Sequence, residues 1–458
     1  MIPRTLLAAA ILALCTTATH ATDLLQVWEA ARQHDPQGAI SNANRAAGLS
    51  RQAQAEALWR PNVALSASVG WGGAQSQING AQFSAPGMPQ SSGVAFATSV
   101  TGAGATRRLA LSARQPLYNP ERMAQSRQLG IAAAASEHEW KLAQQDWMLQ
   151  TTQRYFDVVL AERRWSLIVQ QQAAVDKALT EAKDRFAIGD IPITDTLEAG
   201  ARAQALNAQV IAAANELDAV RFVLSDITGI APPDQQLQRP TAAGAALDRT
   251  EPLADRLSLA ELQNPMIKLQ EAQLQAAQQE VRKHSIQASP TVDLVAQASR
   301  EEVSGSGDFG SASNSQSQQM LGVMLNLPLY TGGWRSAKLQ EALHLEEKTR
   351  AELERARLQN GQMTRAAWLA VHSGRARIAA QQAAHAASQE RLAATQLGRQ
   401  VGDRTTLDLL NAHNDAAAAE LALLQTHTDL LLSRMRLEAM SGQLDLGTLQ
   451  SINTALQP

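Results

Sequence analysis

The sequence predicts a mixed α and β fold with an internal duplication, in which very long helices combine with four amphipathic strands per chain. Three observations lead to this prediction: proline landmarks that recur in the same order, segments of alternating apolar residues, and helical runs without proline. Composition agrees, because 45% of the 458 residues are apolar but only 4% are aromatic, which suits helices packed through small side chains better than a thick globular core. The formal net charge of −3 and the lack of a basic stripe give no reason to expect a nucleic-acid partner.

Residues 1–21 have the pattern of a secretory signal peptide. Arg4 supplies the positive charge, Leu6 to Leu14 form the apolar stretch, and Thr19-His20-Ala21 gives a small-residue cleavage site. The apolar stretch is too short to span a bilayer, and the only cysteine, Cys15, lies within the same segment. No later stretch is apolar over the length of a membrane helix, so we expect an exported protein that is periplasmic, secreted or an outer-membrane barrel.

Proline landmarks indicate the duplication. Pro36 and Pro61 are 25 residues apart, and so are Pro265 and Pro290. Two further motifs recur in the same order in both halves of the chain. They are Gln115-Pro116-Leu117-Tyr118 with Leu327-Pro328-Leu329-Tyr330, and Ile188-Gly189-Asp190 with Val401-Gly402-Asp403. Chance readily produces one such match but not three in order, so we infer two structural repeats.

Alternation of apolar residues predicts one hairpin in each repeat. The expected strands are residues 62–73, 105–115, 291–302 and 318–327. The prolines that flank the first hairpin are 55 residues apart and those of the second 38, so 17 extra residues are expected in the first connection, where residues 74–96 are rich in Gly, Ser, Gln and Pro. Strands of about ten residues suit a tilted crossing of a bilayer, although a half-buried sheet in a soluble protein gives the same alternation.

Four strands cannot close a membrane barrel by themselves, because an open edge in lipid leaves backbone groups unpaired. Several copies must therefore associate; two would give eight strands and three would give twelve. Residues 121–187 and 335–397 are helical runs without proline, and the first would span about 100 Å. Their heptad-like apolar spacing and many alanines predict antiparallel coiled-coil packing.

Two segments at the ends of these helical runs are distinctive. They are Val401 to Ala412, with the sequence VGDRTTLDLLNA, and Phe186-Ala187-Ile188-Gly189 followed by Ile193-Thr194-Asp195. With the two hairpins, they resemble the TolC family of outer-membrane factors, the outer membrane efflux and type I secretion proteins, over essentially the whole mature length. The resemblance implies a homotrimer that forms a twelve-stranded outer-membrane β-barrel, continued by a long α-helical periplasmic tunnel. It also implies a non-enzymatic duct that docks on a periplasmic adaptor (membrane fusion) protein and an inner-membrane ABC or RND-type transporter, and that carries secreted proteins or small toxic compounds outward.

The expected domain map follows from this resemblance and the repeats. It comprises a signal peptide (1–21), a first periplasmic helix (22–60), the first barrel hairpin (61–116), the first tunnel helices (117–229), an inter-repeat linker (230–250), a second periplasmic helix (251–289), the second hairpin (290–328), the second tunnel helices (329–443) and a C-terminal tail (444–458).

The resemblance also implies a pore constriction at the periplasmic end, made by Asp408 and Asn411. Converging carboxylates on a narrow axis attract cations and disfavour anions. One acidic ring is expected here where some relatives have two. The residues themselves offer a second role, because Asp408 follows Thr405 by three positions and would complete a capping box at a helix N-terminus.

Asp195 and Arg404 match positions of a gate network that links neighbouring helices in the family, and Arg399 stands where relatives carry a tyrosine. A charge-assisted pair there would hold the closed state. Asp195 followed by Glu198 also fits a helix N-cap, and Arg404 fits a solvated turn.

Gly189 and Gly402 fit left-handed helix C-caps, and the resemblance assigns both tips, with Asp190 and Asp403, to adaptor docking. Relatives often carry leucine or threonine at the two aspartate positions, so we expect a different adaptor preference.

No cofactor or catalytic residue is predicted. Gly305 to Gly310 matches G-x-G-x-x-G, but it lies between two expected strands, whereas a nucleotide site needs a helix after the motif. The histidines show no metal-ligand spacing. The alternative to a duct is a periplasmic or secreted coiled-coil scaffold protein without channel activity.

Overall fold

The computed structural model describes residues 22–83, 86–87, 91–231, 237–240, 251–285, 289–307 and 310–457. The predicted signal peptide and most of the expected linker lie outside the described residues. The chain divides into two compact units. We call Gly48–Ala134 with Ala272–Arg350 the sheet unit, and Met1–Ala47 with Ala135–Glu271 and Ala351–Pro458 the helical unit.

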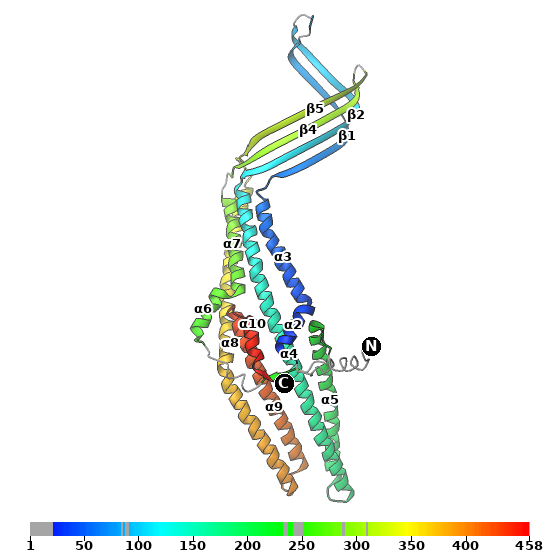
Figure 1. Cartoon of the computed structure of the whole chain (residues 1–458), viewed down its shortest axis with the longest axis vertical. Coiled ribbons are helices and arrows are strands. Elements are labelled where there is room, and N and C mark those ends of the chain that lie inside the picture. Colours follow the sequence, from blue (N-terminus) through cyan, green and yellow to red (C-terminus); the bar gives the residue numbers. More distant parts are fainter. Residues whose placement is uncertain are drawn as a thin grey trace, which may run out of the picture. The chain divides into compact units, whose positions relative to one another are not determined.

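The sheet unit contains a four-stranded antiparallel sheet in the order β1-β2-β4-β5 (Figure 1). The strands are β1 (Asn62–Phe83), β2 (Ser91–Tyr118), β4 (Thr291–Gly307) and β5 (Gly310–Asn326). Residues 74–96, expected in a connection, are largely paired in β1 and β2 instead, with register shifts that begin between Gly72 and Ala74. The strands extend into this region because backbone N–H and C=O groups form the antiparallel ladder, and a sequence rich in small polar residues does not prevent this pairing.

One face of the sheet is apolar across all four strands. Because directly paired residues point to the same side, the pairs Leu65↔Leu111, Leu111↔Ala298 and Leu294↔Val323 place these residues on one face. Val69, also on this face, is 80% exposed. The opposite face carries polar pairs such as Arg108↔Glu301. An exposed apolar face backed by a polar one is typical of a sheet that meets lipid on one side and water on the other.

The two outer strands of the sheet, β1 and β5, are open. Among the described residues, each pairs with a strand on one side only. Their free edges present rows of backbone N–H and C=O groups, which are a template for pairing with another chain. The sheet is therefore incomplete in a single copy.

Long helices dominate the rest of the described chain. They are α4 (Pro120–Ala187), α5 (Ile193–Thr228), α8 (Trp334–Gln400) and α9 (Thr406–Met440). Helix α4 has 68 residues and α8 has 67, so each extends about 100 Å. No helix among the described residues is both long and apolar enough to cross a membrane.

Each repeat also has a shorter helical segment that proline interrupts. Residues 22–60 contain α2 (Leu24–His34) and α3 (Pro36–Ala57), and residues 251–289 contain α6 (Leu253–Gln263) and α7 (Pro265–Ser285). The sequence suggested one helix in each segment. The break arises because proline begins a new helix and cannot continue the preceding one. The residue before it caps the new helix in both repeats: Asp35 accepts from Gln37 N at 2.9 Å, and Asn264 from Met266 N at 2.9 Å.

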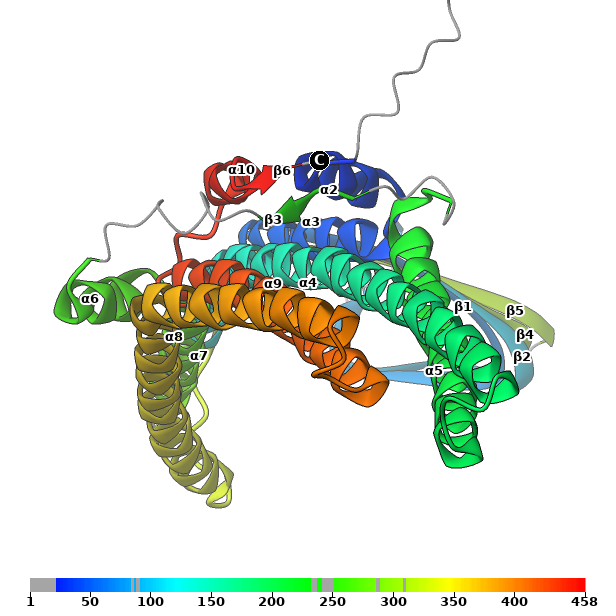
Figure 2. The same ribbon diagram turned by 90° about the horizontal axis from the view of Figure 1, so that it is seen from below.

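The main hydrophobic core lies in the helical unit, where α2, α4, α5, α9 and α10 (Leu446–Asn453) meet. Tyr155, Phe156 and Met435 are fully buried there. The Tyr155 hydroxyl donates to the Gln238 carbonyl at 2.8 Å, beside the short strand β3 (Arg239–Pro240). Strand β3 pairs with β6 (Leu456–Gln457), and Figure 2 shows α2, α10 and both strands on one side of the layer that contains α4 and α9.

Two helical arms extend from this core. One consists of the last part of α4 with α5, and the other of the last part of α8 with α9. A small cluster of Val175, Ala178, Ala203 and Leu410 packs between the arms. The two alanines of this cluster allow close helix approach, so the arms are held in contact by little apolar surface and by the polar links described below.

Candidate functional site

The candidate site is the pair of helix–turn–helix tips where the arms end. Helix α4 turns into α5 through residues 188–192, and α8 turns into α9 through residues 401–405. Gly189 and Gly402 have φ values of +79° and +84°. Asp190 N donates to Arg185 O at 2.9 Å, and Asp403 N donates to Gly398 O at 2.8 Å. This bonding defines a Schellman cap at both tips and confirms the predicted left-handed glycines.

Apolar side chains are exposed at both tips. Ile188 is 80% exposed and Val401 is 74% exposed, and each directly precedes the turn glycine. The aspartates that follow the glycines differ in their contacts. Asp190 accepts from Arg185 Nε at 2.6 Å, whereas Asp403 forms no such pair with any residue that the structure describes. The internal repeat of the sequence points to Ile188 and Val401, because a β-branched apolar residue directly precedes the turn glycine in both repeats.

Asp408 closes a capping box at the start of α9. Thr405 N donates to Asp408 Oδ2 at 3.0 Å, and Asp408 N donates to Thr405 Oγ1 at 3.0 Å. The backbone bond from Thr405, and then its hydroxyl, lowers the pKa of the Asp408 carboxyl below its usual value. The capping role is confirmed, and it keeps the carboxylate charged. The pore role stays a prediction.

Asn411 lies one turn further along α9 and contacts the other arm. Arg202 of α5 donates from Nη2 to Asn411 Oδ1 at 2.8 Å. Sequence reasoning found Asn411 but missed Arg202, which no motif marks. The bond ties α5 to α9.

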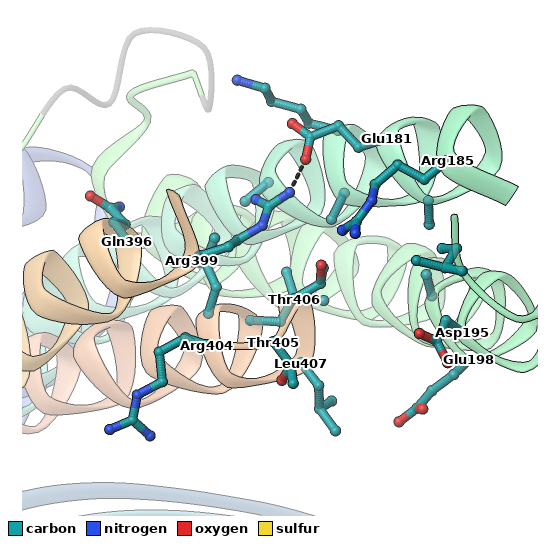
Figure 3. A pocket seen from close by; sticks show the side chains of 18 of the residues that line it. Glu181, Arg185, Asp195, Glu198, Gln396, Arg399, Arg404, Thr405, Thr406 and Leu407 are labelled. Carbon is teal, nitrogen blue, oxygen red and sulfur yellow. Dashed lines mark hydrogen bonds and ion pairs between the residues drawn. The ribbon is translucent and has the colours of Figure 1, made fainter. Parts of the chain in front are cut away.

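Arg399 makes a second link between the arms. Its guanidinium forms an ion pair with Glu181 of α4, and the two side chains are 25% and 37% exposed. Figure 3 shows this pair as the dashed contact between the two helices. Glu181 was also missed, because it lies eight residues before its tip glycine and belongs to no recognisable turn motif.

Asp195 and Arg404 are not in contact within one chain. Figure 3 shows the Arg404 side chain directed away from Asp195, and no ion pair among the described residues joins them. The N-cap of α5 is Pro192, with no side-chain capping bond, so the alternative that Asp195 caps this helix is wrong. Asp195 lies instead in the first turn, where its negative charge interacts favourably with the helix dipole and stabilises the helix.

A cavity of about 1100 Å³ lies between the ends of the arms, and Asp195, Arg399 and Arg404 are among the residues that line it. Basic side chains outnumber acidic ones in its lining. The basic ones are Lys177, Arg185, Arg202, Arg399 and Arg404, and the acidic ones are Glu181, Asp195 and Glu198. Among the described residues, no group of three or more His, Cys, Asp and Glu side chains is placed to hold a metal ion. The arrangement is suited to polar links that can break and reform.

Comparisons with known proteins agree with this architecture. A family model described as "Outer membrane efflux protein" matches residues 257–443. The chain is 25% identical to the outer membrane protein TolC of Escherichia coli (strain K12) over 445 residues, covering 96% of this chain and 86% of TolC. It is 26% identical to the proteases secretion protein PrtF of Dickeya chrysanthemi over 338 residues, covering 73% and 72% of the two chains.

Solved structures share the fold. The outer membrane protein VceC of Vibrio cholerae superposes with a TM-score of 0.70 at 18% identity, covering 92% of this chain and 97% of VceC. The outer membrane channel CmeC of Campylobacter jejuni gives a TM-score of 0.70 at 14% identity, covering 95% and 90%.

Proposed function

This chain belongs to the TolC family of outer membrane efflux proteins, and we propose that three copies assemble into one closed twelve-stranded channel. The protein is an outer-membrane component of export systems, with a part in the periplasm, and its role is transport rather than catalysis. The channel itself supplies no energy for the passage of substrates, and partner proteins drive the export.

The open four-stranded sheet is the observation that carries the proposal. Strands β1 and β5 each leave one edge unpaired, and an unpaired edge in hydrocarbon costs several kcal/mol for each polar group. Pairing β5 of one copy with β1 of the next removes every edge once the ring closes. The apolar face, with Leu65, Leu111 and Val323, then meets outer-membrane lipid, and the polar face lines the lumen.

The tips of the arms supply the proposed periplasmic constriction. Three Asp408 carboxylates would converge on the axis with Asn411 one turn away, and the capping box would keep them charged. Within a copy, Arg399 with Glu181 and Arg202 with Asn411 hold the two arms together. We propose that Arg404 pairs with Asp195 of a neighbouring copy, since the single chain keeps them apart, and that all three links open when substrate is exported.

The outermost residues of the tips supply the proposed docking surface. Exposed Ile188 and Val401 stand beside Gly189 with Asp190 and Gly402 with Asp403. An apolar anchor with a polar rim suits recognition by a protein, and we propose that a periplasmic adaptor binds here and couples the channel to an inner-membrane ABC or RND-type transporter. PrtF is a proteases secretion protein and the matching family model describes efflux proteins, so both secreted proteins and small compounds are candidate substrates.

Planar bilayer recording tests the constriction. We expect the wild type to conduct and to be blocked by multivalent cations added on the periplasmic side. Asp408→Asn should weaken that block, whereas Asp429→Asn, which removes a charge elsewhere on α9, should not. Equal block in all three proteins would show that Asp408 does not line the pore. Recovery of the protein in the soluble periplasmic fraction without conductance would favour the scaffold alternative.

A further inference from the structure

A positive charge stands beside the proposed acidic constriction. Asp408 and Asn411 are three residues apart on α9 and therefore lie on one face of the helix, about 5–6 Å from each other. Arg202 Nη2 bonds to Asn411 Oδ1 at 2.8 Å, and a guanidinium is charged at every accessible pH. The charged guanidinium of Arg202 therefore lies next to Asn411, whichever way Asn411 faces in the assembled channel.

The Arg202 charge is not cancelled within its own chain. Its hydrogen-bond partner is a neutral amide, and no ion pair of the described residues joins it to a carboxylate. Glu198, four residues earlier on α5, lines the same cavity with Asp195, but neither is within ion-pair distance of Arg202. The cavity lining is accordingly more basic than acidic.

The two charges act on the same passing ion. In a trimer, three carboxylates would form one ring and three guanidinium groups a second ring one helical turn away. The Asp408 and Asn411 positions are about 5–6 Å apart on the helix, and the guanidinium is bonded to Asn411, so the separation of the two rings is comparable with the Debye length of about 8–10 Å in ordinary salt. An ion at the constriction therefore senses both rings, and the attraction of the carboxylates for cations is offset.

We propose that Arg202 is a specificity-determining residue of this channel, which reduces the cation preference of the Asp408 ring and admits anionic solutes. The inference rests on the proposed function, because it needs Asp408 and Asn411 to line the conduction path. The inference also goes beyond the proposed function. The amide of Asn411 would orient the guanidinium of Arg202, whereas an acidic residue at position 411 would add a second acidic ring.

Reversal potentials in a KCl gradient across planar bilayers test the inference. Arg202→Gln should raise the cation-to-anion permeability ratio, and tighten block by multivalent cations, by about threefold or more, since a unit charge about 6 Å from an ion is worth that factor even in bulk water. Arg202→Lys keeps the charge and should leave the permeability ratio near its wild-type value. Asn411→Asp neutralises the guanidinium without removing it and should move the ratio in the same direction as Arg202→Gln.

Each outcome decides a separate point. An unchanged ratio in Arg202→Gln and Asn411→Asp, with a clear loss of cation preference in Asp408→Asn, would overturn the role of Arg202 and leave the constriction standing. If Asp408→Asn also left the ratio unchanged, the constriction itself would be refuted. A heat-sensitive oligomer band on gels, recorded for every variant, excludes loss of assembly as the cause.

Discussion

The ion pair between Glu181 and Arg399 offers a direct test of the proposed closed state of the arms. It joins α4 to α8, and the two side chains are 37% and 25% exposed. Because this exposure lets water screen the pair, its coupling energy should be about 0.5–1 kcal/mol. Neutralising either partner should therefore raise the ratio of open to closed channel by about two- to fivefold, since 1.4 kcal/mol corresponds to a factor of ten.

A double-mutant cycle in planar bilayers measures this coupling. The open fraction is recorded for wild type, Glu181→Gln, Arg399→Gln and the double variant. We expect the double variant to open no more readily than either single variant, because the pair is already broken. The exchange of Glu181→Arg with Arg399→Glu should restore part of the closed population.

The pair between Arg164 and Glu216 is the matched control, because it joins α4 to α5 within one arm at 2.8 Å and is similarly exposed. Breaking it should leave the open fraction unchanged. Single-variant effects at Glu181 and Arg399 that simply add in the double variant would show that the two residues do not act as a pair and would refute the reasoning.

Three further predictions follow from the same structure. Gly402→Ala places a Cβ at φ +84°, costs about 1 kcal/mol, and should speed hydrogen exchange at the α8–α9 tip; unchanged exchange would argue against the cap. Because the pKa of Asp408 is lowered, both its charge and its capping contribution persist above its usual pKa of about 3.9 and are lost only as pH falls through the lower folded value. Block by multivalent cations should therefore be equal at pH 7 and pH 5, and a loss of block already at pH 5 would contradict this. Val323→Arg on the apolar face of the sheet should cost about 2–4 kcal/mol of membrane stability, while Gln318→Arg on the polar face should be tolerated; urea titration of the membrane-inserted protein compares the two.

Much of the fold follows from residues whose backbone chemistry is unusual. Pro36 and Pro265 mark the repeats in the sequence, although the helix breaks at these prolines, which lack a backbone N–H, were not predicted. Gly189 and Gly402 mark the tips because they adopt positive φ. The length of the first hairpin could not be predicted, since residues 74–96 have little strand propensity and the backbone ladder alone extends the strands.

The polar links of the site were harder to foresee. Glu181 is 218 residues from Arg399 in sequence, and Arg202 is 209 residues from Asn411, so only the folded arms bring them together. The expected capping role of Asp195 failed because Pro192 is the N-cap residue of α5, which places Asp195 within the first turn. The proposed pair of Asp195 with Arg404 involves a second copy of the chain, which a single sequence does not position.

Counting subunits in the conducting species tests the central claim most directly. Native mass spectrometry of protein extracted from outer membranes, on the same preparation that is recorded in bilayers, should give a mass of three mature chains and a single class of channels. A monomer that stays soluble without detergent and carries no current would contradict the account, because the unpaired edges of β1 and β5 would then need no neighbour.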